Sequence, residues 1–264
     1  MKIFISADIE GTNGIADWDE TFPDKPDYRP FAERMTAEVG AVCAGVNEAA
    51  PGCAILVKDA HETGRNIDHA KLPENALLNR GWSGSPLSMM DCLDSSFDAA
   101  IFTGYHSPAG TGGSPLAHTM RTRLAWVRIN GAPASEFLIN YYISMYFGVP
   151  LVMVSGDAAL CAAVRQTDPN IKTVAAYQGT GMSVTSKHPR LTLQELRETA
   201  KAAVLDRKNV KIELPREFKT EIYFKEHSEA YRAAFFPGAH RVSDNITGFD
   251  TADYMRFLTF LLFV

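Results

Sequence analysis

The chain has few cysteines, and none of them has the spacing of a thiolate metal site. Cys43, Cys53, Cys92 and Cys161 are widely separated and form no Cys-x-x-Cys pair. Thiolate zinc sites place cysteines close together in the sequence, and disulfide frameworks are typical of small secreted chains. The sequence therefore disfavours both, and we expect a reducing, cytoplasmic compartment.

Positive charge is also scarce. The 264 residues include 26 lysines and arginines against 31 aspartates and glutamates, which gives a net charge of −5. A nucleic-acid or anionic-membrane surface needs a basic patch that this composition does not supply. The chain also lacks a Gly-x-x-x-x-Gly-Lys loop, which counts against nucleotide phosphate. We expect neither a nucleic-acid nor a membrane partner, and chemistry on a small molecule or peptide.

No long apolar run competes with this assignment. Lys2 leads directly into a short strand that ends in acids, so no signal peptide is expected. The apolar segment 257–264 is far shorter than the roughly 20 residues that span a bilayer. We expect this segment to pack on a second domain or a neighbouring subunit, because an exposed apolar tail promotes aggregation. A homo-oligomer follows as a hypothesis.

What the chain does contain is a set of short apolar runs, each followed by an acid or a histidine. Short continuous apolar runs are typical of strands buried on both faces of a parallel sheet. Ligands bind beyond the carboxyl ends of such strands. The polar residues are therefore predicted to lie along one edge of one sheet. The runs are 3–5 before Asp8 and Glu10, 54–57 before His61, 99–102 before His106, and 149–154 before Asp157.

Asp8 and Glu10 are the most informative pair. If residues 2–8 form a strand, side chains two residues apart point to the same face. Two carboxylates held that close repel each other unless a positive charge lies between them. A divalent metal is the usual solution in a pocket, so the pair predicts a metal site.

Helical periodicity fills the stretches between the strands. Apolar residues recur at intervals of three and four over 31–46, and Pro51-Gly52 ends this helix. A second helix is predicted from about Pro133 to Gly148, with Glu136 in its first turn, where a carboxylate is favoured by the helix dipole alone. Alternating strands and helices predict an α/β fold with a mostly parallel sheet and helices on both faces.

A loop rich in glycine, serine and proline at 107–115 interrupts this alternation. It is followed by 125–129 and Asn130-Gly131, which predict one arm of a hairpin with a type I′ turn. His118 lies between the loop and the hairpin. Such loops often shape or close a pocket, so His118 is a candidate site residue by its predicted neighbourhood.

We predict a catalytic metal-binding α/β domain at 1–160 and a smaller α+β domain with a role in oligomerisation at 161–264. The second part shows turn signals, a capping-box spacing at Thr192–Glu195 and shorter apolar runs. Its expected elements are a helix at 158–166, a strand at 171–177, a loop at 178–181, a helix from Thr192 to about Asn209, strands at 219–225 and 240–249 flanking a helix at 226–235, and a last helix from 250–253.

Six short motifs, in this order and spacing, resemble the M55 family of D-aminopeptidases, the dipeptide-transport-associated zinc peptidases. The resemblance extends over the whole chain and is dense up to about residue 160. Bulky Phe137 and the pair Thr12-Asn13 depart from the family pattern and leave the substrate details open. The motifs are Asp8-Ile9-Glu10-Gly11, Lys58-Asp59-Ala60-His61, Gly104-Tyr105-His106, Ala117-His118-Thr119, Ser135-Glu136 followed by Asn140, and Ser155-Gly156-Asp157.

The resemblance implies a binuclear zinc aminopeptidase that acts on short peptides or amides with an N-terminal D-residue such as D-Ala. Asp8 matches the bridging ligand, and His118 matches the catalytic histidine, which the family uses as nucleophile. The residues themselves do not decide whether His118 acts as a nucleophile or as a general base. The resemblance also implies a ring-shaped homodecamer. The further matching ligands are Glu10, His61, His106 and Glu136.

Two other functions fit the residues. Acid and histidine ligands would also serve a binuclear metal phosphoesterase, and a noncatalytic peptide-binding protein could keep a metal as a structural clip. An extra histidine, His118, counts against the second alternative. This ligand chemistry also admits manganese, iron or cobalt in place of zinc.

Overall fold

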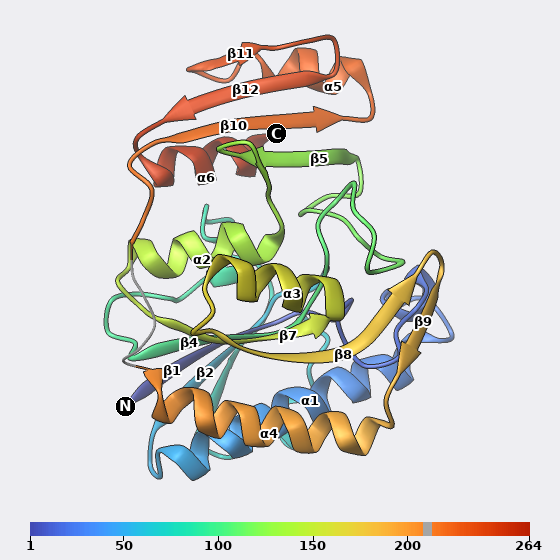
Figure 1. Ribbon diagram of the computed structural model, residues 1–264, viewed down its shortest axis with the longest axis vertical. Coiled ribbons are helices and arrows are strands. Elements are labelled where there is room, and N and C mark those ends of the chain that lie inside the picture. The colour runs from blue at the N-terminus through green and yellow to red at the C-terminus, as the bar shows by residue number, and fades with distance from the viewer. Residues whose placement is uncertain (208–212) are drawn as a thin grey trace.

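Figure 1 shows a computed structural model of the chain, which describes residues 1–207 and 213–264. Two β-sheets lie at different levels along the long axis of the molecule, and helices pack between and outside them. Among the described residues, the larger sheet has seven strands and the smaller has five. The predicted α/β class, with a mostly parallel sheet and helices on both faces, is confirmed.

The larger sheet is parallel apart from its last strand, which pairs antiparallel. Its central strands are buried along their whole length, as the continuous apolar runs predicted. The carboxyl ends of the parallel strands therefore meet at one edge. In spatial order the strands are β3 (Ala76–Asn79), β2 (Ala54–Asp59), β1 (Lys2–Ala7), β4 (Ala99–Tyr105), β7 (Leu151–Asp157), β8 (Lys172–Thr180) and β9 (Ser183–Ser186).

Helices cover both faces of this sheet (Figure 1). α1 (Tyr28–Ala49) and α4 (Pro189–Leu205) pack together on one face, and α2 (Glu136–Tyr146) and α3 (Ala158–Thr167) lie on the other. Short 3-10 helices lie in the connections. They include η1 (Trp18–Glu20), η2 (His69–Lys71) and η3 (Ser88–Met90).

The smaller sheet is antiparallel and lies beyond α2. α5 (His227–Ala233) lies on its outer face, and α6 (Tyr254–Phe263) fills the space toward α2, where the Tyr254 hydroxyl donates to the Ile139 carbonyl oxygen over 2.8 Å. The strand order is β11 (Ala239–Arg241), β12 (Ile246–Thr251), β10 (Phe218–Phe224), β5 (Leu124–Ile129) and β6 (Ala132–Pro133).

The two sheets draw strands from both sides of residue 160. β5 and β6 precede it and join the smaller sheet, whereas β8 and β9 follow it and join the larger one. The division into domains at 1–160 and 161–264 stays a prediction.

The hairpin at Asn130-Gly131 is confirmed, and both residues have the positive φ that a type I′ turn requires, 53° and 81°.

Several predicted boundaries in the second half were wrong. Residues 178–180 extend β8 instead of forming a loop, and the single strand predicted at 240–249 is two strands joined by a turn. α4 begins at Pro189, where the His188 Nδ1 accepts from the Arg190 amide, so the capping-box spacing did not mark the helix start. The helix end predicted near Asn209 lies outside the described residues.

The apolar segment 257–264 packs inside the molecule for most of its length. Phe257 and Phe260 are fully buried, while Phe263 keeps 68% of its surface exposed.

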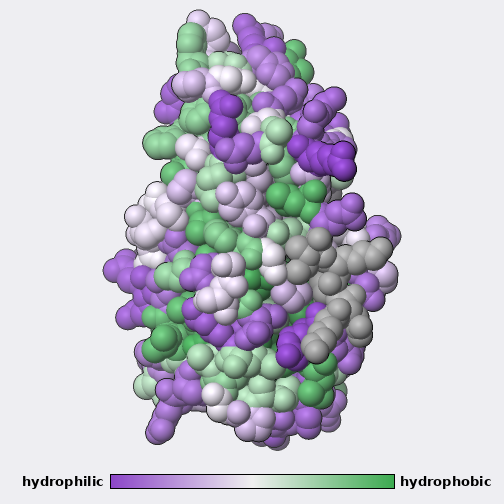
Figure 2. Space-filling model, turned by 90° about the vertical axis from the view of Figure 1, so that its left-hand side faces the viewer, coloured by the Kyte–Doolittle hydropathy of each residue, from purple (hydrophilic) through white to green (hydrophobic). Residues whose placement is uncertain are grey.

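Within 1–207 and 213–264, none of the helices combines the length and the apolar character that a membrane crossing requires. In the face drawn in Figure 2, hydrophobic and hydrophilic side chains are interspersed.

The loop that follows β1 is fastened by Asn13. Its amide donates to Glu38 Oε1 over 2.9 Å, and its side-chain nitrogen donates to the Thr192 hydroxyl over 2.8 Å and to the Ala176 carbonyl over 3.1 Å. The Arg34 guanidinium donates to the Asn13 carbonyl over 2.6 Å. One residue thus ties this loop to α1, β8 and α4.

Glu38 gives this anchor a pH dependence. Burial of the carboxyl raises its pKa from 4.5 to about 7, against the opposing effects of the Asn13 amide and Arg34. Because the folded-state pKa is the higher one, the stabilising contribution is complete below about pH 4.5 and is lost as the pH rises through 7.

We predict that Glu38→Gln, which keeps an acceptor for the Asn13 amide, removes this loss. Urea unfolding of both proteins should show that the variant gains on the wild type between pH 5 and pH 8, by up to about 3 kcal/mol. A stability difference that is the same at both pH values would contradict the prediction.

Candidate metal centre

The structure brings all six predicted site residues together at the carboxyl edge of the larger sheet. Asp8 and Glu10 follow β1, His61 follows β2, and His106 follows β4. Glu136 is the first residue of α2, whose N-terminus points to the same place, and Ser135 caps this helix by accepting from the Leu138 amide. The buried members of the set are Asp8, Glu10, His61, His106 and Glu136, and His118 lies in the loop between β4 and β5.

Asp8 and Glu10 converge by a turn and not by strand alternation. β1 ends at Ala7, one residue before the predicted end, and the chain then turns through a hydrogen bond from the Thr12 amide to the Ile9 carbonyl. The prediction that both acids share one face of a strand was therefore wrong in its geometry. The turn still brings them to one partner, because both lie within 3.3 Å of the His61 ring.

Each of the three histidines places one ring nitrogen against a main-chain carbonyl. A carbonyl oxygen only accepts, so the nitrogen facing it carries the proton, and the other nitrogen of a neutral imidazole keeps a lone pair. The main chain therefore fixes which nitrogen is available to a ligand. The pairs are His61 Nε2 with Thr21 at 3.0 Å, His106 Nδ1 with Ser107 at 2.9 Å, and His118 Nδ1 with Leu116 at 2.9 Å.

The available nitrogens face carboxylate oxygens. His61 Nδ1 lies 3.0 Å from Glu10 Oε2 and 3.3 Å from Asp8 Oδ1. His106 Nε2 lies 3.4 Å from Glu136 Oε2 and 3.6 Å from Asp8 Oδ2. Lone pairs that face anionic oxygens repel unless a cation lies between them.

The hydrogen bonding of two buried atoms also indicates a cation at the site. Glu10 Oε2 and His106 Nε2 are buried without a hydrogen-bond partner among the described residues. Ligand atoms of Asp8, Glu10 and His106 lie within 4.8 Å of one another, and so do those of His106, His118 and Glu136. Two groups of potential ligands thus share His106, and the arrangement can hold one or more metal ions.

Burial and charge shift the pKa values of the carboxyl groups in opposite directions. Burial and the charge of Glu10 raise the pKa of Asp8 well above its usual range. Burial alone would also raise the pKa of Glu10 and that of Glu136. The charge of His61 outweighs burial at Glu10, and the charge of His106 does so at Glu136, so both pKa values are lowered. The three acids cannot all be ionised together without compensating positive charge.

The pKa values of the three histidines also shift in opposite directions. Burial opposes protonation of His61 and His106, but the neighbouring carboxylates outweigh it, raising the pKa of His61 well above its usual value and that of His106 to about 10. For His118, burial and then the charge of His106 lower the pKa, so its ring is neutral near pH 7. His118 therefore differs chemically from the two histidines that lie deeper.

Two acids from the sequence motifs lie outside this cluster and hold its loops. Asp59 accepts from the amides of Asn66 and Ile67, and the Asn66 side chain donates to the His61 carbonyl over 2.7 Å. Asp157 accepts from the Ser107 amide over 2.6 Å and so holds the residue after His106. Such outer contacts orient potential ligands without touching a metal.

Comparisons with known proteins identify the family. The M55 peptidase family, described as D-aminopeptidase, matches residues 1–263. The chain belongs to the M55 peptidase family. A D-aminopeptidase of Bacillus subtilis (strain 168) is 32% identical over 243 residues, which cover 90% of this chain and 86% of the relative. The predictions of M55 membership and of a peptidase are thereby confirmed.

One solved structure gives the same result for the fold. It is a zinc-dependent D-aminopeptidase, DppA, from Bacillus subtilis, described as a self-compartmentalizing protease. It superposes with a TM-score of 0.93 at 29% identity, and the match covers 100% of this chain and 96% of that one.

The cavity of this M55 peptidase contains residues that the sequence analysis missed. Its volume is about 640 Å³, and Trp18, Phe22 and Trp82 line it together with the acids. The Trp18 ring packs edge-on against His118 at 5.2 Å, and His118 stacks on His106 at 4.2 Å. Trp18 and Trp82 lie on connecting segments with no periodic pattern, so nothing in the local sequence marked them.

The M55 site also depends on a close approach of backbone segments. Gly104 has a φ of +72°, and a Cβ at this position would lie 2.1 Å from the Asp8 carbonyl oxygen. The Asp8 amide donates to the Thr103 carbonyl over 2.9 Å, and the Gly11 amide donates to the Gly104 carbonyl over 2.7 Å. A side chain at Gly104 would therefore push apart the segments that carry Asp8 and His106.

We predict that Gly104→Ala destabilises the protein by more than about 2 kcal/mol, since it adds a backbone clash to the strain of a positive φ. Gly148→Ala is the matched control, because Gly148 has a φ of +69° and open space where its Cβ would be. Urea unfolding would give the two losses, and equal losses would contradict the role of the close approach.

Proposed function

We propose that this M55 family member is a binuclear zinc aminopeptidase that hydrolyses short peptides with an N-terminal D-amino acid such as D-Ala. The observation that carries the proposal is the orientation of three histidines whose available nitrogens face buried carboxylates. The relatives described as D-aminopeptidases, one of them zinc-dependent, support the reaction and the metal.

The donor set suits zinc. Imidazole nitrogens and carboxylate oxygens, without thiolates, are typical of hydrolytic zinc sites that keep open positions. We assign Asp8, Glu10, His61, His106 and Glu136 as the ligands, with Asp8 central because it approaches both His61 and His106. Zinc bound there supplies a Lewis acid that polarises the scissile carbonyl and acidifies water.

We assign His118 as the catalytic histidine. Its Nδ1 is held by the Leu116 carbonyl, so Nε2 is the free nitrogen, and it lies 3.5 Å from Glu136 Oε1. Its lowered pKa keeps the ring neutral, which both a general base and a nucleophile require. Trp18 and His106 hold the ring between them, so that its direction in the cavity is fixed.

The two alternative functions have less support. The family match favours a peptide substrate over a phosphate ester. A noncatalytic metal clip gives no reason for a neutral histidine with a free nitrogen on the cavity wall.

We predict about two zinc ions per chain in protein purified without chelator, and hydrolysis of D-Ala-D-Ala but not of p-nitrophenyl phosphate. His118→Ala should lower turnover by at least about 100-fold while the zinc content stays unchanged. Elemental analysis and a ninhydrin assay would give both quantities. His227→Ala, on α5 and outside the cavity, is the matched control.

Each result has a distinct meaning. Loss of zinc together with activity in His118→Ala would make His118 a ligand, as its place in one of the ligand groups allows. Full activity of this variant with full zinc would contradict any catalytic role for His118. Hydrolysis of the phosphate ester alone would favour the phosphoesterase.

We also propose a homo-oligomer, with a decameric ring as its form. The relative described as self-compartmentalizing supports assembly. Large apolar side chains are exposed on the C-terminal layer, including Tyr231 at 56%, Phe235 at 71% and Phe263 at 68%. We expect light scattering to give a mass near ten times the 29.0 kDa of one chain. A mass of 29.0 kDa over a range of concentrations would contradict assembly.

A further inference from the structure

The cavity at the metal centre is lined by side chains of both charges. Asp8, Glu10, Glu62 and Glu136 line it together with Arg121 and Arg123. A volume of about 640 Å³ is typical of sites for small molecules, which span roughly 300 to 1,000 Å³. A ligand that fills the cavity meets both charges.

The arginines are held close to the catalytic histidine by the backbone. The Met120 amide donates to Glu136 Oε1 over 2.7 Å, and the Leu124 amide donates to the Arg121 carbonyl over 3.1 Å, which closes a turn. Arg123 is five residues beyond His118, so their backbones are at most about 17 Å apart even in a fully extended chain. That distance is spanned by a peptide of about five residues or fewer.

Arg121 and Arg123 differ in the N–H donors that remain free for a ligand. Arg121 binds the main-chain carbonyls of Leu262 and Val264 and so holds α6 against the cavity. Arg123 donates one hydrogen bond, from Nη1 to Glu229 Oε1 over 2.9 Å. Its Nε is buried without a partner among the described residues. Arg123 thus keeps donors for a ligand.

Positive charges lie close together around Arg121. Burial and the charges of Arg123 and Arg232 lower the pKa of Arg121, and the charge of Glu229 raises it. An anion that enters the cavity is therefore favoured beside the arginines and repelled by the acids. Arginine also suits a carboxylate, because its planar fork can donate two parallel hydrogen bonds.

We propose that the cavity binds free, zwitterionic short peptides, with the C-terminal carboxylate held by Arg123 while the N-terminal residue lies at the metal centre. The proposal rests on the aminopeptidase function and adds a substrate class to it. A peptide with a blocked C-terminus loses the charged hydrogen bonds at Arg123. Peptides of up to about five residues are long enough to reach from His118 to Arg123.

The test compares D-Ala-D-Ala with its C-terminal amide, which differs only in the charge at that end. We expect the KM of the zinc-loaded wild type to be about 10 to 100 times lower for the acid, as charged hydrogen bonds predict. Calorimetry with zinc-loaded His118→Ala gives the affinities without turnover and should show the same ratio.

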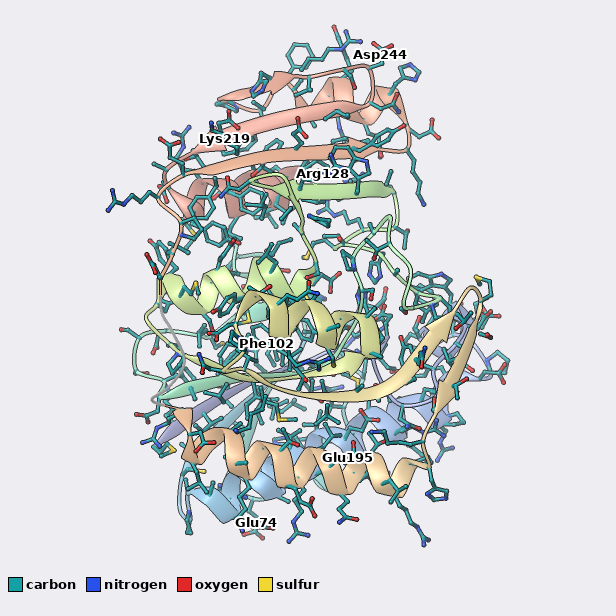
Figure 3. The ribbon with its side chains drawn as sticks, in the orientation of Figure 1. Glu74, Phe102, Arg128, Glu195, Lys219 and Asp244 are labelled. Carbon is teal, nitrogen blue, oxygen red and sulfur yellow. The ribbon has the colours of Figure 1, made fainter. Side chains whose placement is uncertain are left out.

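Arg123→Gln should bring this ratio close to one. Glu229→Gln removes the ion-pair partner of Arg123 but keeps the cation, so it should retain the preference for the acid. If Arg123 acted only through its ion pair with Glu229, both variants would lose the preference equally. Arg128→Gln, on strand β5 directly after Arg123 and outside the cavity, is the control for the substitution itself (Figure 3).

Binding and turnover separate the two proposals. Equal affinity of acid and amide in the zinc-loaded protein would overturn the carboxylate site, even if both peptides were hydrolysed. Absence of hydrolysis with zinc bound would contradict the aminopeptidase function, and calorimetry would still decide whether Arg123 selects the acid. Retention of the acid preference in Arg123→Gln would also overturn the assignment.

Discussion

Three carboxylates buried within reach of one another are the constraint on which this structure depends. Asp8 and Glu10 lie in one turn after β1, Glu136 comes from a segment far away in the sequence, and burial penalises the charged form of each. A fold driven only by apolar burial would keep them apart. The sheet order instead brings β1, β2 and β4 side by side, so that positively charged partners or metal ions can compensate all three at one edge.

Main-chain groups carry most of the positioning at this edge. Carbonyl oxygens select the available nitrogen of each of the three histidines at the site, and amides of Ser107 and Asn66 are held by Asp157 and Asp59. Main-chain groups move little once their strands are paired. The direction of the histidine lone pairs is therefore set by the fold as a whole, and this rigidity suits a site whose reaction depends on orientation.

The sequence predicted the strands that lead to the candidate site better than it predicted the second half of the fold. His61 and His106 follow strands that are buried on both faces, and continuous apolar runs mark such strands reliably. β9 is short, polar and partly exposed, so it has no such run. Thr192 looked like a helix cap, but its hydroxyl accepts from Asn13, a contact between residues far apart in the chain. Pairing of β5 with β10 is equally remote from any local pattern.

Arg123 shows why composition alone could not describe the ligand. A net charge of −5 disfavours a surface for nucleic acid, because such a surface needs many basic residues spread over a wide area. A small ligand responds to the charges that line one cavity. There, Arg121 and Arg123 line the same cavity as the acids, although the chain as a whole is acidic. A peptide with free ends carries one charge of each sign, so the fold and not the composition determines which ligand is complementary.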